Sequence, residues 1–268
     1  MTSNPSVVRE AVPPPDDEGA QGAARAGRGK GSSRRKSAAG GEESAGRGRR
    51  GGAAARHRER RREIVAATRA LFDQREMRDA NIDDIARAVG VNRAIIYRHF
   101  SSKDELFALT LSEYLEDLTA QLTEVDDAAL AAPQRLAVIA GAYADFCLRY
   151  PAFIDCALAI LRQPGNYLLN ELSDAALQHL GQRLVNCLSI IARVLRDGTA
   201  TGDFKVEDAD LTANMIYLQT LGALHLARTG FIVRDSGRGY PDAVPVDEEQ
   251  FRSLVVRSVL AAAGSVSR

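Results

Sequence analysis

The chain has 268 residues, 45% of them hydrophobic, so it can bury a sizeable core and is not a disordered protein as a whole. Its formal net charge is zero, yet residues 1–62 carry 15 Lys and Arg against 7 Asp and Glu, which leaves an acidic remainder. No run reaches the roughly 18 to 20 consecutive apolar residues that a membrane span requires, and the N-terminus lacks the apolar centre of a signal peptide. We therefore expect a cytoplasmic protein without a membrane partner.

Residues 1–55 consist mainly of Gly, Ala, Ser, Arg and Pro, so they cannot offset the entropy cost of ordering and are predicted to form a disordered arm. Between Arg25 and Arg62 the chain carries 14 Lys and Arg against 3 Asp and Glu. This charge favours contact with a polyanion, and such binding weakens steeply as salt rises. A tolerated, merely solvated extension explains the same composition equally well.

Ordered structure is expected from about Arg56, where apolar residues recur every three or four positions, as they do on one face of a helix. A second helix is expected after Asn81, because asparagine caps helix starts. It is expected to end at Gly90, because glycine tolerates the positive φ of a helix end. Asn92 then caps a third helix over about 93–100. Two short helices joined by a three-residue turn that contains glycine are typical of a helix-turn-helix motif.

Ser102 and Glu105 match the S-x-x-E capping box, which predicts a helix that continues to about Glu124. No sustained alternation of apolar and polar residues predicts a strand, and residues 230–246 are interpreted as one long loop. Further helices are predicted at about 134–149, 151–163, 168–197, 207–229 and 247–263.

The sequence therefore predicts an all-α fold in three parts. A disordered basic arm (1–55) precedes a three-helix helix-turn-helix DNA-binding domain (56–103), whose connecting helix continues to about 126. Residues 127–268 are predicted to form a helical domain that binds an effector and forms a dimer.

If Ile96 and Phe100 face inward, the third helix presents side chains that suit DNA. The second helix of such a motif enters the major groove, where arginine bonds guanine and a small or apolar side chain contacts a thymine methyl group. The residues expected on or beside this outer surface are Arg93, Ala94, Ile95, Tyr97, Arg98 and His99, and the DNA interface is taken to include the helix-starting residues Asn81 and Asn92.

Residues 64–107 resemble the DNA-binding domain of the tetracycline-repressor (TetR/AcrR) family. The elements D-I-A, G-V, Y-x-H-F and S-K-x-E-L occur in that order within them. The resemblance implies that Tyr97, His99 and Lys103 contact backbone phosphates, with the residues that start the third helix at the groove. Because Ala94 and Ile95 replace a common Gly-Thr pair of the family, no base preference is inferred.

A structural alternative exists for each of these residues. Tyr97 and His99 can instead complete the core of a three-helix domain, and Lys103 can be an ordinary solvated lysine. A lysine in the first turn of a helix is unfavourable for the helix dipole unless an anion approaches it. That local conflict favours a phosphate contact at Lys103.

Aromatic and polar residues of the C-terminal helices are candidates for lining an effector cavity, although core packing is the more ordinary explanation for each one. A mainly apolar cavity with a few polar groups suits a lipid-like or aromatic effector. The candidates are Tyr143, Phe146, Tyr150, Phe153, Cys156, His179 and Tyr217, together with Tyr167 and His225.

The resemblance also implies that the last two helices of each subunit form a four-helix dimer interface. Dimerisation suits a helix-turn-helix protein because two recognition helices that read two half-sites add their binding energies. The candidate interface residues are Leu211, Met215, Leu218, Gly222, Phe251, Leu254, Val255 and Val259.

Enzymatic activity is not expected. The four histidines do not lie beside a nucleophile within a motif or at metal-ligand spacing, and no phosphate-binding glycine loop occurs. Cys147, Cys156 and Cys187 lie singly in apolar helical patterns and are interpreted as reduced core residues. We therefore expect neither a metal nor another cofactor.

These observations predict a ligand-responsive, nucleoid-associated transcriptional regulator. As a homodimer it is expected to bind a palindromic operator in double-stranded DNA, most simply as a repressor, and to be released by a small apolar effector of unknown identity. The alternative is a non-specific DNA-coating protein dominated by the basic arm. That alternative predicts nearly equal affinity for operator and random DNA, whereas a regulator prefers its site by roughly a thousandfold or more.

Overall fold

The computed structural model describes residues 41–74 and 81–264, and the chain divides after Gly48 into two units. Of the first unit only residues 41–48, the start of a helix, are described, so the statements below concern the unit that begins at Arg49. Most of the predicted disordered arm, residues 1–55, lies outside the described residues. The first helix begins at Gly41 rather than near Arg56.

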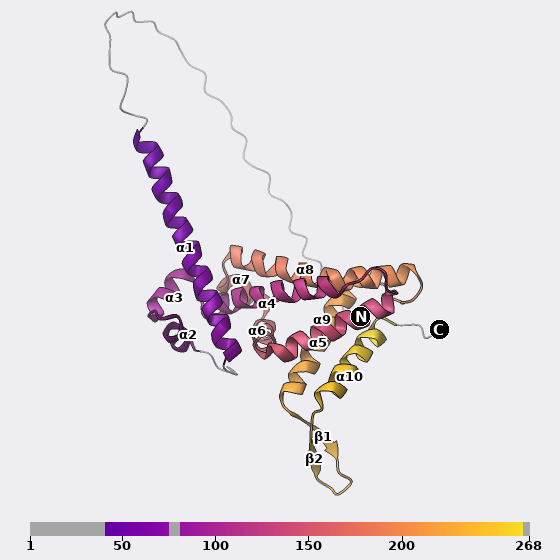
Figure 1. The fold of residues 1–268 in the computed structure, drawn as a ribbon. Helices are drawn as coiled ribbons and strands as arrows, with labels where there is room; N and C mark the ends of the chain where they lie inside the picture. Colours follow the sequence, from indigo (N-terminus) through magenta and orange to yellow (C-terminus); the bar gives the residue numbers. More distant parts are fainter. Residues whose placement is uncertain (1–40, 75–80, 265–268) are drawn as a thin grey trace, which may run out of the picture. The chain divides into compact units, whose positions relative to one another are not determined.

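The all-α fold class is confirmed, with one short β-hairpin added near the C-terminal end (Figure 1). In chain order the elements are α1 (Gly41–Gln74), α2 (Ile82–Val89), α3 (Arg93–His99), α4 (Lys103–Val125), α5 (Ala132–Arg149), α6 (Pro151–Leu161), α7 (Gly165–Glu171), α8 (Asp174–Ala200), α9 (Ala209–Arg228), β1 (Phe231–Asp235), β2 (Pro241–Pro245) and α10 (Glu248–Ala262).

Helices α1, α2 and α3 pack around a small apolar core. Ile64 on α1, Ile85 on α2 and Ile96 on α3 are all fully buried, and Phe100 closes the end of α3. Complete burial of such side chains contributes about 1.5–3 kcal/mol each relative to exposure. This core fixes the orientation of α3, which makes few contacts of its own because it is only two turns long.

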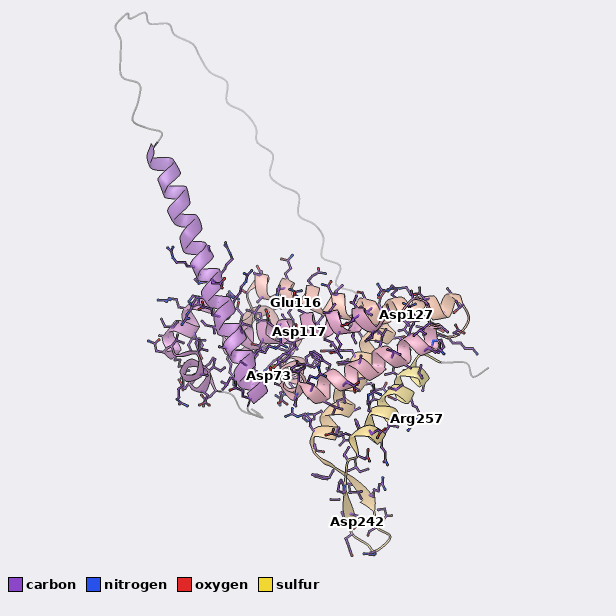
Figure 2. All side chains as sticks on the ribbon, viewed as in Figure 1. Asp73, Glu116, Asp117, Asp127, Asp242 and Arg257 are labelled. Carbon is purple, nitrogen blue, oxygen red and sulfur yellow. The ribbon has the colours of Figure 1, made fainter. Side chains whose placement is uncertain are left out.

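A polar joint connects α1 to α4. The hydroxyl of Tyr114, a fully buried residue of α4, donates a hydrogen bond of 2.6 Å to the carboxylate of Asp73. Arg69 lies over the Tyr114 ring, with its guanidinium carbon 4.4 Å from the ring centroid, and donates to Asp117 at 2.5 Å. Asp73 and Asp117 are labelled at this joint in Figure 2. The end of α1 is thus held against the middle of α4.

Glu105 ties α1, α4 and α8 together. It is 2% exposed, and its carboxylate accepts hydrogen bonds from the amide and hydroxyl of Ser101, at 2.6 and 2.5 Å, from the hydroxyl of Ser173 at 2.7 Å, and from Arg61. Burial acts to raise the pKa of Glu105, but these hydrogen bonds outweigh it and hold the pKa below its usual range. Ser102 caps α4 as predicted, but Glu105 reaches back to the amide of Ser101 instead of that of Ser102.

The body is built on α4, which packs against α5, α6 and α8, while α9 packs against α8 and α10 against α5. Asp126 ends α4. The buried Arg135 of α5 donates to both of its carboxylate oxygens, at 2.8 and 3.1 Å, and to Asp197 of α8 at 2.9 Å. This bidentate contact suits a buried arginine because its charge and its planar donors are satisfied together.

The single helix predicted over 168–197 is wrong, because two helices, α7 and α8, cover this segment. Leu172 has an extended backbone, with φ −98° and ψ 141°, and it ends α7. Ser173 then caps α8 by accepting a hydrogen bond from the amide of Ala176. The apolar pattern continues across the break, whereas the serine cap that marks it was not recognised in the sequence.

The prediction that no strand occurs between Gly230 and Val246 is also wrong. β1 and β2 pair antiparallel, with Phe231 opposite Pro245 and Asp235 opposite Pro241. Both faces of this hairpin are largely exposed, so its sequence lacks the apolar–polar alternation that burial of one face imposes. Between the strands Gly237 and Gly239 adopt positive φ, the conformation that glycine permits.

The three cysteines are free and buried, as predicted. Burial is the main cause that raises the pKa of each thiol, to about 12 for Cys187. No helix in the described part of the chain is both long and apolar enough to cross a membrane.

Candidate nucleic-acid interface and junction cavity

Helices α2 and α3 start and stop where the predicted capping residues lie. The side chain of Asn81 accepts a hydrogen bond of 2.8 Å from the amide of Asp84, and that of Asn92 accepts one of 2.9 Å from the amide of Ile95. Gly90 ends α2 with φ 70°, and its amide donates back into the last turn. Each cap contributes roughly 1 kcal/mol, so short-range contacts set the angle at which α3 leaves the turn.

The outward face of α3 is polar and partly preordered. Arg93 is exposed, and its guanidinium lies 3.4 Å from the hydroxyl of Tyr97 and 3.8 Å from the carboxylate of Asp83. The Tyr97 side chain is 41% exposed, a high fraction for a tyrosine next to a domain core. Ala94 and Arg98 are exposed as well, while Ile95 is half-buried. This face offers guanidinium and hydroxyl donors to an anionic or base-edge partner.

His99 does not lie on the outer surface as expected. It is 7% exposed and packs against His57 of α1, with 4.4 Å between the ring centroids, and its Nδ1 has no hydrogen-bond partner among the described residues. The reason is helical spacing, since position 99 lies three residues after the buried Ile96 and on the same side of α3. Burial first, and the nearby His57 and arginine charges second, lower the pKa of His99.

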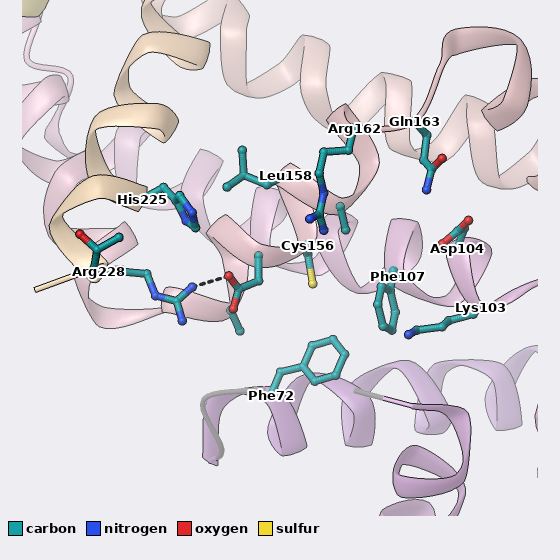
Figure 3. Close-up of a pocket in the computed structure, with 14 residues that line it drawn as sticks. Phe72, Lys103, Asp104, Phe107, Cys156, Leu158, Arg162, Gln163, His225 and Arg228 are labelled. Carbon is teal, nitrogen blue, oxygen red and sulfur yellow. Dashed lines mark hydrogen bonds and ion pairs between the residues drawn. The ribbon is translucent and has the colours of Figure 1, made fainter. Parts of the chain in front are cut away.

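Lys103, the first residue of α4, is half-buried. Its ammonium nitrogen lies 4.9 Å from the centroid of the Phe107 ring, a cation–π arrangement. Lys103 and Phe107 both line a cavity, and Figure 3 shows them together on the side of it that faces Phe72. The structure thus places Lys103 beside a cavity as well as next to the helix-turn-helix.

This cavity, which we call the junction cavity, lies between α1, α4, α6 and the end of α9 and has a volume of about 620 Å³. Aromatic and aliphatic side chains alternate in its lining with charged ones (Figure 3). An ion pair between Arg228 and Asp155 forms part of one wall. Other lining residues include Phe72, Lys103, Asp104, Phe107, Cys156, Leu158, Arg162 and His225.

The sequence pointed to only part of this lining. Of the nine effector candidates, Cys156 and His225 line the junction cavity, and Tyr167 is exposed on α7. Five others form an aromatic cluster: Tyr143 stacks on Tyr217 at 6.1 Å, and Phe153 packs edge-on against Phe146 at 5.5 Å, with Tyr150 beside Phe146. His179 is exposed and borders a separate hollow between α1, α4 and α8.

Phe72, Phe107, Arg162 and Arg228 were not predicted as lining residues. Arg228 meets Asp155 across 73 positions of sequence, and no local pattern signals such a contact. Phe72 and Phe107 read as ordinary members of two amphipathic helices. The cavity therefore arises from how separate helices meet.

The predicted dimer residues separate into two groups. On α9, Leu211, Met215 and Leu218 are 60%, 57% and 43% exposed, and nothing lies within 4 Å of the position that a Gly222 side chain would take. Leu254 on α10 is also exposed and Phe251 is half-buried.

Val255 and Val259 contradict the expectation that they face a partner. Each is 2% exposed, because this side of α10 packs on α5 within the same chain. Their apolar spacing therefore reflects the core of one subunit.

In the part of the chain that the structure describes, no group of three or more His, Cys, Asp or Glu side chains is placed to hold a metal ion.

Residues 64–110 match a family model described as bacterial regulatory proteins, tetR family. Over this segment the chain is similar to the tetR family. The matched segment runs from the buried Ile64 of α1 through α2 and α3 into α4, so it contains the whole candidate interface.

A curated relative with 33% identity over 83 residues is the HTH-type transcriptional activator FasR of Mycolicibacterium smegmatis. The alignment covers 31% of this chain and 38% of FasR, so it spans well under half of that relative.

Solved structures resemble the chain over most of its length. A bacterial regulatory protein in the tetR family from Rhodococcus RHA1 is 19% identical with a TM-score of 0.54, over 77% of this chain and 98% of its own. The transcriptional regulator FadR from Bacillus subtilis, solved in complex with stearoyl-CoA, is 16% identical with a TM-score of 0.52, over 75% and 97%. At these identities the likeness establishes a shared fold.

Proposed function

We propose that this protein is a transcriptional regulator that binds DNA through α3. The observation that carries the proposal is the outward face of α3, where Arg93 and Tyr97 are exposed, paired and held by a capped turn within the segment that matches the tetR family. A helix of this kind fits the major groove, and its first residues meet the base edges. Asn92, Ala94, Ile95 and Arg98 complete the proposed contact surface, with Asn81 and Lys103 beside it.

His99 is not included among the direct contacts that we propose. Its packing on His57 and its 7% exposure support a role in holding α3 against α1. The sequence resemblance implied a phosphate contact at this position.

We also propose that the regulator acts as a homodimer through α9 and α10. Leu211, Met215, Leu218 and Leu226 recur along one side of α9 and are all 43% or more exposed, as is Leu254 on α10. An exposed apolar stripe of this length on a soluble domain marks a contact surface. Packing it against a second copy would remove that apolar area from water and set two α3 helices for two half-sites of a palindrome.

We propose that a small molecule controls DNA binding. FadR is described in complex with stearoyl-CoA and RolR in complex with resorcinol, and both share this fold. In this chain the junction cavity, of about 620 Å³, falls within the usual range of roughly 300–1,000 Å³ for ligand sites. Repression by occupying an operator is the simplest output, and an effector that favours a second spacing of the α3 helices would relieve it.

The test is recovery of sheared genomic DNA by the full-length protein at physiological salt. Wild-type protein is expected to recover a few palindromic sites, and Arg93→Ala to lose them. Arg87→Ala, which removes an exposed arginine of α2 that pairs with Asp84 of the same helix, is the matched control and should retain them. Diffuse recovery that is the same for both variants would refute sequence-specific binding and favour a DNA-coating protein.

FasR is named an activator, so the direction of regulation needs its own measurement. A reporter placed behind a recovered site should be less active when the protein is present. Higher activity in its presence would replace repression by activation and leave the DNA-binding proposal intact.

A further inference from the structure

The two acidic side chains of the junction cavity are already engaged. Asp155 forms an ion pair with Arg228, which also donates a hydrogen bond of 3.2 Å to the backbone carbonyl of Pro151. Asp104 interacts with the hydroxyl of Tyr167 on α7 and raises the pKa of that tyrosine. Among the described residues neither carboxylate forms an ion pair with Lys103 or Arg162, and in the cavity lining Lys103, Arg162 and Arg228 outnumber the two acidic side chains.

Two cations of the same cavity are not engaged in this way. Neither Lys103 nor Arg162 has an ion-pair partner among the residues that the structure describes. The Lys103 ammonium lies over the Phe107 ring, and a half-buried ammonium on an aromatic ring gains less than it would from a carboxylate or phosphate. The charge of the cavity is thus complementary to an anion.

The rest of the lining is suited to a hydrocarbon. Phe72 and Phe107 meet edge to face with 5.4 Å between ring centroids, and Cys156 and Leu158 of α6 lie across the cavity from them (Figure 3). A ligand that fits such a surface has an apolar chain or ring, and one that satisfies Lys103 and Arg162 also has a negative head group.

We propose that the junction cavity binds an anionic amphiphile, an apolar molecule that ends in a carboxylate or phosphate, and that this ligand competes with DNA for Lys103. The second part rests on the proposed DNA-binding function. Lys103 is the first residue of α4, directly after the helix-turn-helix, and its side chain lines the cavity. An ammonium that is paired with a ligand head group is no longer available to a DNA phosphate.

The aromatic pair adds a second connection. Phe72 belongs to α1, which packs with α2 and α3, and Phe107 belongs to α4. A ligand inserted beside these two rings therefore alters the packing between α1 and α4. Because coupling between sites is reciprocal, bound DNA must weaken ligand binding by the same factor as the ligand weakens DNA binding.

The ligand site is tested without DNA, by isothermal titration of the full-length protein with decanoate, decyl phosphate and decanol. Decanoate or decyl phosphate is expected to bind at least tenfold more tightly than decanol, because the same chain then carries a charge. Lys103→Met and Arg162→Met, which keep the stem and remove the charge, should each weaken binding of the anionic probe by roughly tenfold. The preferred anion distinguishes a carboxylate from a phosphate head group.

Arg149→Met is the matched control, since Arg149 is exposed at the end of α5 and does not line the cavity. Equal affinity for decanol and both anions would overturn the proposal, as would unchanged affinity in both cavity variants. Each variant is checked by circular dichroism and thermal unfolding. If Lys103→Met does not fold, Arg162→Met still decides, because Arg162 is exposed at the C-terminal end of α6.

Competition for Lys103 is tested at a genomic site recovered by the wild-type protein. The anionic probe should weaken DNA binding by wild-type protein, while Lys103→Met should bind DNA more weakly and respond less to the probe. An equal response in both proteins would refute the shared role of Lys103. Failure to recover any specific site would refute the proposed function and leave the titration result standing.

Discussion

Replacement of Glu105 by glutamine tests whether a buried carboxylate holds α1 against α4 and α8. Each oxygen of Glu105 has two donors. One accepts from Arg61 and the hydroxyl of Ser173, and the other accepts from the amide and the hydroxyl of Ser101. Glutamine keeps the shape but turns one of these oxygens into an NH₂ group that faces two donors.

The expected loss follows from those contacts. Hydrogen bonds to a charged acceptor are worth about 1.5–3 kcal/mol each, and two of the four are lost in Glu105→Gln. Arg61 is partly exposed and regains some hydration, and the serine hydroxyls can rotate, so the lower end of that range applies to each bond. We expect the free energy of unfolding to fall by about 3 kcal/mol.

Urea unfolding of the full-length protein, followed by circular dichroism at neutral pH and fixed concentration, measures this change. Glu116→Gln is the matched control, since Glu116 lies on the same helix but is 52% exposed and forms a surface pair with Arg183. A surface pair of that kind should cost less than about 0.5 kcal/mol. If Glu105→Gln lowers stability no more than the control, the claim that Glu105 joins α1, α4 and α8 is wrong.

Three further predictions concern other parts of the fold. Because the pKa of His99 is lowered, the unfolded chain takes up a proton near its ordinary pKa of about 6.5 that the folded chain resists, so stability should fall as the pH drops below that value; His99→Asn should flatten that slope in urea titrations, and an unchanged slope would contradict it. Met215→Glu places a charge on the exposed stripe of α9 and should convert dimer to monomer in sedimentation without loss of helix, whereas a persistent dimer would exclude this face. In Gly198→Ala the new methyl group would lie 2.2 Å from the Phe204 ring, and the free energy of unfolding should fall by about 1–3 kcal/mol in thermal unfolding. The control Gly181→Ala meets nothing within 4 Å and should not lower stability, so similar losses of stability in both variants would refute the packing argument.

Local chemistry explains why the helix-turn-helix could be predicted in detail from the sequence. Asn81, Gly90 and Asn92 act on backbone groups within four residues of themselves, so the sequence alone contains all the partners. Ser102 behaves in the same way at the start of α4. Capping signals of this kind predict where helices begin and end without any knowledge of tertiary structure.

Contacts between distant segments explain most of what the sequence could not predict. The burial of His99 depends on His57, which lies on another helix, and the burial of Val255 and Val259 depends on α5. An apolar residue spacing shows that a helix face is covered. It does not show whether the covering surface belongs to the same chain or to a partner.

The hairpin was missed for a different reason. β1 and β2 bury almost nothing, so their residues were not selected for the alternation by which strands are recognised. Pairing through the backbone leaves little trace in side-chain chemistry. Five residues per strand also give too short a window for any periodicity.

The rate at which a thiol reagent labels the buried cysteines reports how often the folded protein opens. Thiol reagents attack the thiolate, and burial raises the pKa of Cys147, Cys156 and Cys187 while keeping reagents away. Labelling of the native protein should therefore be slow and limited by local or global opening. Cys156 borders the junction cavity, whereas Cys187 is buried on α8. The order in which the two are labelled would therefore distinguish movement at the cavity from unfolding of the body, without an added probe.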